Sequence, residues 1–119
     1  MTAPRILIVE DDSFVALLLD YTLVKLGYSI CGTEYTEDGA VATAFKCCPD
    51  AMVVDVGLAQ GNGVRAINRI LQQRYVPHVF ISGDRLDYVG LHPHAVRLHK
   101  PFRDVDLAAS LSQVFSCGR

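Results

Sequence analysis

The fold is decided by the stretch Arg5-Ile-Leu-Ile-Val-Glu-Asp-Asp12, in which a short apolar run ends in three acidic residues. A continuous run rich in β-branched residues predicts a strand that is buried on both faces, as the strands of parallel sheets are. A helical pattern follows from Ser13 to Leu26, with Asp12 or Ser13 as its cap and Gly27 as its stop. A buried strand that leads directly into a helix is the repeating unit of an α/β domain.

The same alternation continues along the rest of the chain. Strands are predicted at residues 5–10, 28–32, 51–55, 79–82 and 95–99, and helices at residues 13–26, 36–48, 63–74 and 103–115. Only twelve residues, Gly83 to His94, separate the last two strands, so we predict that the helix between them is reduced to about one turn near Arg85–Val89, or lost. We expect residues 1–119 to form one doubly wound domain with a five-stranded parallel sheet.

Composition argues against several classes of function. The formal net charge is −2, so there is no basic field for a nucleic-acid backbone, and direct nucleic-acid binding is not expected. The apolar stretches are short and no charged-then-apolar leader opens the chain. We therefore expect no membrane span and no secretory signal, and we expect a cytoplasmic location.

The cysteines and histidines of the sequence do not show the pattern of a metal site. The C-x-x-C spacing of a metal site is absent from the four cysteines, which are Cys31, Cys47, Cys48 and Cys117. We interpret them as reduced thiols that mostly pack in the interior. His92 and His94 flank Pro93 and could form a metal pair, but without a third ligand we interpret them as loop histidines.

Polar residues close the apolar runs at one edge of the predicted sheet. In chain order they are Glu10, Asp11, Asp12, Asp55, Ser82 and Lys100. Ligands of open parallel sheets bind outside the carboxyl ends of the strands, so these side chains should surround one site. Ionised carboxylates cannot crowd together without a cation, and oxygen ligands with room for waters suit Mg²⁺. A lysine and a hydroxyl at the same edge favour phosphoryl transfer, with Asp55 as the nucleophile.

Over essentially its whole length the sequence resembles the receiver domain of two-component response regulators. The motifs that carry the resemblance are Ile8-Val-Glu-Asp-Asp12, Val53-Val-Asp-Val56, Gly63, Phe80-Ile-Ser-Gly83 and Lys100-Pro-Phe102. Each motif is weak alone, but their order, each at a strand–helix boundary, is highly specific. The resemblance implies a flavodoxin-like sheet with strand order 2-1-3-4-5, an order that belongs to the family and does not follow from these residues.

The resemblance also assigns the phosphoacceptor and the metal ligands. Asp55 would take a phosphoryl group from a phosphohistidine on a histidine kinase or a histidine phosphotransfer protein. Asp11 would bind Mg²⁺ directly together with Asp55, Glu10 would bind it through a water, and the backbone carbonyl of Gly57 would add a ligand. Such a protein assists only its own phosphorylation and dephosphorylation, is not an enzyme, and signals to a downstream protein target.

The resemblance places two residues on the phosphoryl oxygens and two at the switch. Ser82 and Lys100 would hold phosphoryl oxygens, and the Lys100–Pro101 peptide bond is expected to be cis. In receivers an aromatic residue three positions before this lysine turns inward as the hydroxyl moves. That position is Arg97, which cannot bury its charge there without a partner, so the usual switch of Ser82 with an aromatic residue is not expected. The motif Phe80-Ile-Ser-Gly83 resembles a variant of the Phe-Ala-Thr-Gly motif of a bacterial receiver subgroup.

The first predicted helix carries two apolar stripes. The stripe expected to face the sheet consists of Val15, Leu18, Leu19, Thr22 and Leu26. A second stripe, roughly 140° away at about 100° per residue, consists of Phe14, Leu17, Tyr21 and Val24. We interpret the second stripe as a partner surface, because in receivers this helix lies where the helical bundle of the kinase docks. Scattered surface residues or contact with a second copy are the alternatives.

Two other functions stay open at the level of sequence. A pseudo-receiver that binds partners without phosphorylation is favoured by Ser82 and Arg97, whereas the intact acidic residues and Lys100 argue against it. A Mg²⁺-dependent phosphohydrolase normally has an acidic residue two positions after its nucleophile, where this chain has Gly57. The leading hypothesis is a stand-alone phosphoacceptor, although a piece of a longer protein would have the same sequence.

Overall fold

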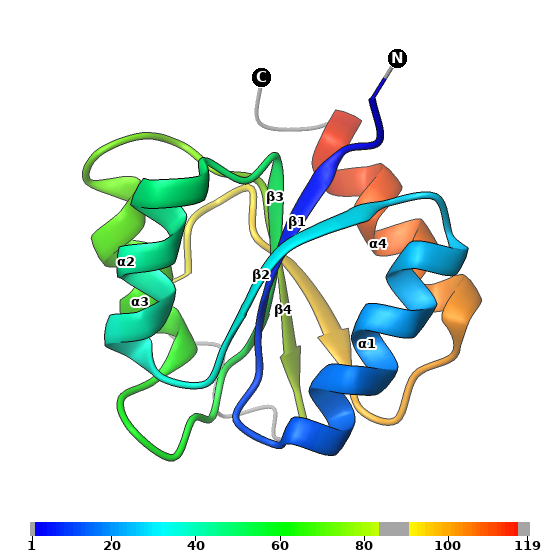
Figure 1. Ribbon diagram of the computed structural model, residues 1–119, viewed down its shortest axis with the longest axis horizontal. Coiled ribbons are helices and arrows are strands. Elements are labelled where there is room, and N and C mark those ends of the chain that lie inside the picture. Colours follow the sequence, from blue (N-terminus) through cyan, green and yellow to red (C-terminus); the bar gives the residue numbers. More distant parts are fainter. Residues whose placement is uncertain (1, 84–90, 117–119) are drawn as a thin grey trace.

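Nine elements alternate along the part of the chain that the computed structural model describes, residues 2–83 and 91–116. They are β1 (Arg5–Val9), α1 (Ser13–Lys25), β2 (Ser29–Glu34), α2 (Glu37–Cys47), β3 (Ala51–Asp55), α3 (Gly63–Leu71), β4 (His78–Ser82), β5 (Val96–His99) and α4 (Asp104–Ser116). The five strands form one parallel sheet in the order β2-β1-β3-β4-β5. Helices α1 and α4 cover one face of the sheet, and α2 and α3 cover the other (Figure 1). The predicted flavodoxin-like, doubly wound fold is confirmed.

The two faces of the sheet build two separate hydrophobic cores. Successive side chains of a strand point to opposite faces. In β1, Ile6 and Ile8 therefore pack in the core beneath α1 and α4, while Leu7 and Val9 pack in the core beneath α2 and α3. All four side chains are fully buried. Burial on both faces is the reason why this strand is apolar at every position.

The two edge strands are less buried than the sequence predicted. The expectation of strands buried on both faces holds for β1, β3 and β4, but β2 is only partly buried and β5 alternates between buried and exposed side chains. Strand β2 also begins and ends later than predicted, and its register against β1 shifts so that Cys31 has no partner residue. An edge strand has a neighbour on one side only, which leaves more of its surface uncovered.

Helix α1 turns a face to the sheet that agrees only in part with the predicted stripe, since Leu19 is buried as expected but Leu18 is not. The buried side chains are Ala16, Leu19 and Leu23, whereas Leu18, which was expected to face the sheet, is 51% exposed. Val15 packs partly against the core, as predicted. Because Ala16 is small, the helix can approach the sheet along the line of residues 16, 19 and 23. Leu18 then lies at the flank, over a cavity toward α4.

The helix starts follow the predicted signals closely, whereas α3 ends at Leu71, three residues before the predicted end at residue 74. Asp12 caps α1 by accepting hydrogen bonds from two backbone N–H groups of the first turn. Gly27, just past the end of α1, has a φ of 102°, which glycine adopts without strain. Thr36 caps α2 by accepting a hydrogen bond from the Gly39 N–H, and α2 ends at Cys47, one residue before the predicted end at residue 48, because Cys48 has a left-handed conformation.

The cysteines of the described residues agree only in part with the prediction. The cysteines Cys31, Cys47 and Cys48 are free, but Cys48 is exposed and is not the packing residue that was predicted. Among the described helices, none has the length and apolar character needed to cross a membrane. The predicted single turn at Arg85–Val89 lies outside the described residues, as does Cys117.

Candidate functional site

The predicted acidic residues meet where β1 and β3 end. These strands are neighbours in the sheet, so their carboxyl ends lie side by side (Figure 1). One carboxylate oxygen from each of Glu10, Asp11 and Asp55 lies within 4.8 Å of the others. Glu10 and Asp55 are buried, and Asp11 is half-buried. Parallel pairing therefore brings Asp55 to the adjacent residues Glu10 and Asp11, from which the sequence separates it by more than forty positions.

Lys100 reaches these carboxylates from the loop between β5 and α4. Its Nζ lies 3.0 Å from Asp55 Oδ2 and 3.5 Å from Glu10 Oε1. The Lys100–Pro101 peptide bond is cis, as predicted, and the Lys100 N–H donates a hydrogen bond to the Ser82 carbonyl at 2.8 Å. Burial alone would lower the pKa of Lys100, but the hydrogen bond and charge of Asp55, followed by those of Glu10, raise it above its usual value.

Both carboxylate oxygens of Asp55 accept hydrogen bonds, one from the distant Lys100 and one from the nearby Gly57. Oδ2 accepts a hydrogen bond from Lys100, and Oδ1 accepts one from the Gly57 N–H at 3.0 Å. Two donors at fixed positions orient the carboxylate. A nucleophile that is oriented before its substrate arrives has less freedom to lose during the reaction.

Glu10 carries a buried oxygen that the described residues leave without a hydrogen bond. Its Oε2 accepts from the Asp12 N–H at 3.1 Å, but Oε1 has only the longer ionic contact with Lys100. Burial is the main reason why the pKa of Glu10 is raised to about 7; the Asp12 N–H lowers it, and the Asp55 carboxylate raises it. An orphaned oxygen beside two further carboxylates is completed by a hard cation. The donors present therefore fit the Mg²⁺ site typical of receivers.

The remaining predicted site residues lie around this acidic group. Ser82 is buried at the end of β4, one residue beyond the level at which Asp55 pairs with that strand. Gly57 follows Asp55 by two residues and is exposed. Arg97 is an exposed residue of β5, where it pairs with Phe80. An exposed arginine agrees with the inference that its charge does not enter a buried slot, while a switching role of Ser82 and Arg97 stays a prediction.

Comparison with known proteins decides the family. Residues 6–112 match the response regulator receiver domain. The chain belongs to this family. Phyllosphere-induced regulator PhyR of Methylorubrum extorquens is 32% identical over 115 residues, which are 93% of this chain and 43% of that protein. Chemotaxis protein CheY of Thermotoga maritima is 31% identical over 68 residues, 57% of each chain. The receiver thus spans less than half the length of PhyR.

Solved receiver structures have the same fold. The solution structure of the PhyR receiver domain of Erythrobacter litoralis is 28% identical and has a TM-score of 0.88, covering 100% of this chain and 95% of that one. A receiver protein of Sinorhizobium medicae has a TM-score of 0.87 and covers 97% of this chain and 96% of its own. At 23% identity, the second likeness shows the fold alone. Receivers with this fold are signalling modules of two-component systems, which act with histidine kinases.

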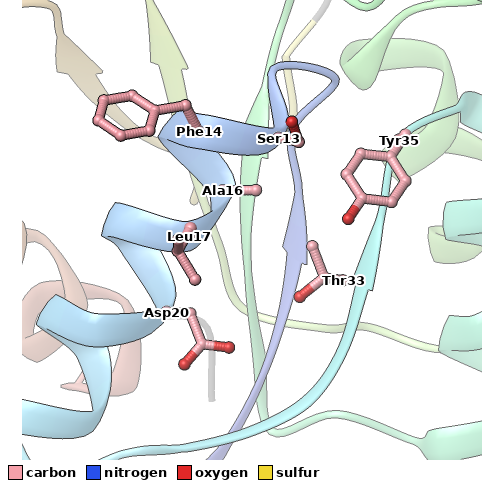
Figure 2. A pocket seen from close by; sticks show the side chains of 7 residues that line it. All are labelled: Ser13, Phe14, Ala16, Leu17, Asp20, Thr33 and Tyr35. Carbon is pink, nitrogen blue, oxygen red and sulfur yellow. The ribbon is translucent and has the colours of Figure 1, made fainter.

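The predicted partner stripe of the receiver is exposed at every position. The exposed fractions are 67% for Phe14, 66% for Leu17, 67% for Tyr21 and 55% for Val24. A groove of about 450 Å³ runs beside this stripe, between α1 and β2. Figure 2 shows Ala16 and Leu17 on the helix side of the groove and Tyr35 opposite them, while the Phe14 ring points away from Tyr35.

A buried carboxylate with charged partners, which sequence reasoning did not predict, lies beside the site. Glu37 is 9% exposed, and its carboxylate accepts hydrogen bonds from the backbone of Asn62 and the side chains of Arg65 and Arg69. Glutamate in the first turn of a helix is ordinarily a solvated residue that complements the helix dipole. No local pattern separates this buried case from the common one.

The histidines of the receiver form no metal group of three among the described residues. His92 and His94 instead contact the Tyr75 ring, with ring centroids 5.1 Å and 6.4 Å from it. The interpretation of these two residues as loop histidines agrees with that placement. His78, which the sequence did not single out, is fully buried beside the same tyrosine.

Proposed function

We propose that this receiver domain accepts a phosphoryl group from a phosphohistidine onto Asp55, with Mg²⁺, and signals through contacts with other proteins in the cytoplasm. The donor would be a histidine kinase or a histidine phosphotransfer protein, and the reader a downstream protein target. The observation that carries the proposal is the convergence on Asp55 of the Lys100 ammonium, the Gly57 N–H and two further carboxylates. Structural ion pairs alone do not require three carboxylates to crowd around one ammonium.

Several residues have separate roles in the phosphoryl transfer. One Asp55 oxygen attacks phosphorus and forms an O–P bond as the N–P bond to the donor histidine breaks, and the departing imidazole keeps the electron pair and takes up a proton. The Lys100 ammonium, already at the Asp55 carboxylate, neutralises a phosphoryl oxygen, and the Ser82 hydroxyl donates a hydrogen bond to another. Bound Mg²⁺, held by Asp11, Asp55 and the Gly57 carbonyl with Glu10 acting through a water, would neutralise the remaining phosphoryl charge.

Phosphorylation by a small donor tests the proposal directly. We expect the wild-type protein incubated with phosphoramidate and Mg²⁺ to gain the mass of one phosphoryl group, and chelation of Mg²⁺ to prevent it. Asp55→Asn should reduce the initial rate by at least about a hundredfold, because the nucleophile is lost. Asp20→Asn, on α1, is the control that keeps the wild-type rate. No incorporation, or equal incorporation by Asp55→Asn, would contradict the proposal.

The alternative function is a pseudo-receiver that binds partners independently of phosphorylation. The exposed Arg97, at the position where receivers carry an aromatic switch residue, favours this alternative. The same labelling experiment separates the two, because a pseudo-receiver would gain no phosphoryl group. Partner binding that is unchanged by Asp55→Asn would point to it as well.

We propose the exposed stripe on α1 as the docking face for the phosphodonor. Four large apolar side chains on one surface helix, beside a groove floored by the buried Ala16, offer the apolar centre that a helical partner needs. Leu17→Ser should slow transfer from a cognate histidine phosphotransfer protein by about tenfold, since a central apolar contact is lost. Phosphorylation by phosphoramidate should not change. Val105→Ser, at an equally exposed residue of α4, is the control.

A further inference from the structure

A buried carboxylate ties the first turn of α2 to the start of α3. Glu37 Oε1 accepts hydrogen bonds from the Asn62 N–H at 3.1 Å and from Arg65 Nε at 2.9 Å. Its Oε2 accepts from the Arg69 guanidinium at 2.9 Å. Burial by itself raises the pKa of Glu37, but these hydrogen bonds from Asn62, Arg69 and Arg65 outweigh burial and lower the pKa below its usual value. The carboxylate is therefore ionised at neutral pH and holds all three donors at once.

The loop between β3 and α3 is clamped on Glu37 from both sides. The backbone N–H of Glu37 donates to the Gln60 carbonyl at 3.1 Å, while its side chain accepts from Asn62. Gly61, between these two contacts, has a φ of 84° and packs so closely that a Cβ there would overlap the Glu37 side chain. Three consecutive loop residues are thus positioned by one residue of α2.

The same loop leads back to the phosphoacceptor through short contacts. Asn62 pairs with Gly57 in an isolated antiparallel bridge, and the Gly63 N–H donates to the Val56 carbonyl at 2.9 Å. Gly57 in turn donates its N–H to Asp55 Oδ1 at 3.0 Å. The contacts run without a gap from Glu37 through Asn62 and Gly57 to Asp55.

We infer that Glu37 is a positioning residue of the phosphorylation site, which holds the loop of residues 57–62 so that Gly57 presents its N–H to Asp55 and its carbonyl to the metal. The inference rests on the proposed function, because only a metal-binding phosphoacceptor needs Gly57 held in place. Residues that do not bind a metal themselves but orient its ligands commonly have a strong effect on the affinity for the metal. Glu37 acts through backbone atoms of the loop and touches neither the metal nor the phosphoryl group.

Asp38 supplies a matched control on the adjacent position. Its carboxylate also pairs with Arg69, at 2.8 Å, but its side chain is 89% exposed and, of the residues described, this arginine is its one ion-pair partner. Asp38→Asn therefore removes a charge next to Glu37 without releasing the loop. Glu37→Gln provides the second comparison, because an amide oxygen can still accept the Asn62 N–H while the negative charge is lost.

The experiment measures hydrogen exchange without metal and Mg²⁺ affinity on the same proteins. In Glu37→Ala, amide exchange at Gly57 and Asn62 in Mg²⁺-free protein should accelerate by at least about tenfold, because the loop opens locally. The Mg²⁺ dissociation constant should rise by about tenfold. In Glu37→Gln, the exchange rate and the Mg²⁺ dissociation constant should lie close to the wild-type values. In Asp38→Asn, both should equal the wild-type values. Thermal unfolding of each variant shows how much stability is lost alongside.

The outcomes separate positioning from simple stabilisation. If Glu37→Ala lowers the unfolding temperature but leaves Gly57 exchange and Mg²⁺ affinity unchanged, Glu37 is only a structural ion-pair partner and the inference fails. If the wild type itself takes up neither Mg²⁺ nor a phosphoryl group, the proposed function fails, while Gly57 exchange still reports whether Glu37 holds the loop. Should Glu37→Ala not fold, Arg69→Met, which removes one of three donors to the carboxylate, should raise the Mg²⁺ dissociation constant about threefold. No rise would overturn the inference.

Discussion

The Lys100 ammonium only partly compensates the negative charge of the acidic site. In the metal-free protein its ammonium compensates the buried carboxylates Glu10 and Asp55, at 3.5 Å and 3.0 Å. One ammonium cannot neutralise Asp11 as well, so the acidic group keeps a net negative charge. That surplus charge is what makes the site attractive to a divalent cation, and it also costs stability when no cation is bound.

The surplus charge predicts opposite effects of Asp11→Asn with and without metal. In the presence of a chelator the variant should be more stable than the wild type by about 1 kcal/mol, because like-charge repulsion is relieved. Mg²⁺ at ten times its dissociation constant should stabilise the wild type by about 1.4 kcal/mol and the variant by much less. Urea unfolding with chelator and with Mg²⁺ measures both. Asp12→Asn, which removes a neighbouring charge but keeps a good helix cap, should respond to Mg²⁺ like the wild type.

His78 is a second residue whose charge state matters to stability. Its Nδ1 lies 2.7 Å from the Val76 carbonyl, and its Nε2 is buried without a hydrogen-bond partner among the described residues. Burial lowers the pKa of His78 below 6.5 despite the Val76 carbonyl, and His92 lowers it further. The unfolded chain therefore takes up a proton before the folded chain does as the pH falls. The stability that the neutral ring contributes is present above the unfolded pKa and is lost below it.

His78→Phe should flatten this pH dependence. The free energy of unfolding of the wild type, relative to that of the variant, should fall as the pH drops from neutral to below the unfolded pKa of about 6.5. Urea titrations of both proteins across this range measure the difference. His99→Gln, at an exposed histidine of β5, should track the wild type. Parallel curves for the wild type and His78→Phe would show that the buried ring does not stay neutral.

At the scale of elements, the junction of β3 and α3 determines where the loop with Gly57 lies relative to Asp55. Helix α3 begins at Gly63, whose Cα lies against the end of β3, and a Cβ at this position would overlap the Asp55 carbonyl oxygen. The Asn62 side chain caps the helix by accepting from the Arg65 N–H at 2.7 Å. Close approach of helix and strand thus fixes the length and path of the loop that carries Gly57. The same glycine is part of the motif that first indicated a receiver.

Gly63→Ala should destabilise the receiver by about 2 kcal/mol or more, since the added methyl group can be accommodated only if α3 or β3 moves. Mg²⁺ affinity should fall along with stability because the loop moves with the helix. Gly83→Ala, where no atom of the described residues lies within 4 Å of the added Cβ, is the control and should change stability by less than about 0.5 kcal/mol. Unfolding by urea, with Mg²⁺ titrations of the folded variants, tests both expectations. Equal stability of the two variants would contradict the close packing at Gly63.

At the scale of the whole molecule, the sheet separates two cores that share no side chain. One core contains buried apolar residues of α1 and α4, and the other contains those of α2 and α3. The two pairs of helices lie on opposite faces of the sheet (Figure 1). The site lies at the edge where both layers end, so its residues depend on both cores. Val114 on α4 and Ile70 on α3 represent the two cores, and each is 1% exposed.

The separation predicts additive losses from substitutions in the two cores. Val114→Ala should cost about 2 kcal/mol and Ile70→Val about 1 kcal/mol, from lost apolar contact and the cavity left behind. In the double variant the losses should add to within about 0.5 kcal/mol, because the two sites share no partners. Urea unfolding of the four proteins completes the cycle. A coupling well above that limit would mean that the sheet transmits packing changes between its faces.

The sequence by itself determined the order of elements, the parallel sheet and the composition of the site. These follow from information carried by neighbouring residues: continuous apolar runs, the caps Asp12 and Thr36, and Gly27 as a stop. The site could be predicted because parallel strands all end at the same edge. The proximity of Asp55 and Lys100 could be predicted because each lies at the end of a strand, although 45 positions separate them in the sequence.

Only the tertiary structure decided which face each helix buries and which polar groups lie inside. Leu18 of α1 was expected to face the sheet but is exposed, because the rotation of the helix is set by how closely Ala16 lets it approach the sheet. Glu37 and His78 are buried because α3 and the Tyr75 segment pack over them, and neither contact is encoded near those residues in the chain. Periodicity specifies that a helix has an apolar side, whereas its rotation and its buried polar groups depend on distant segments packing together.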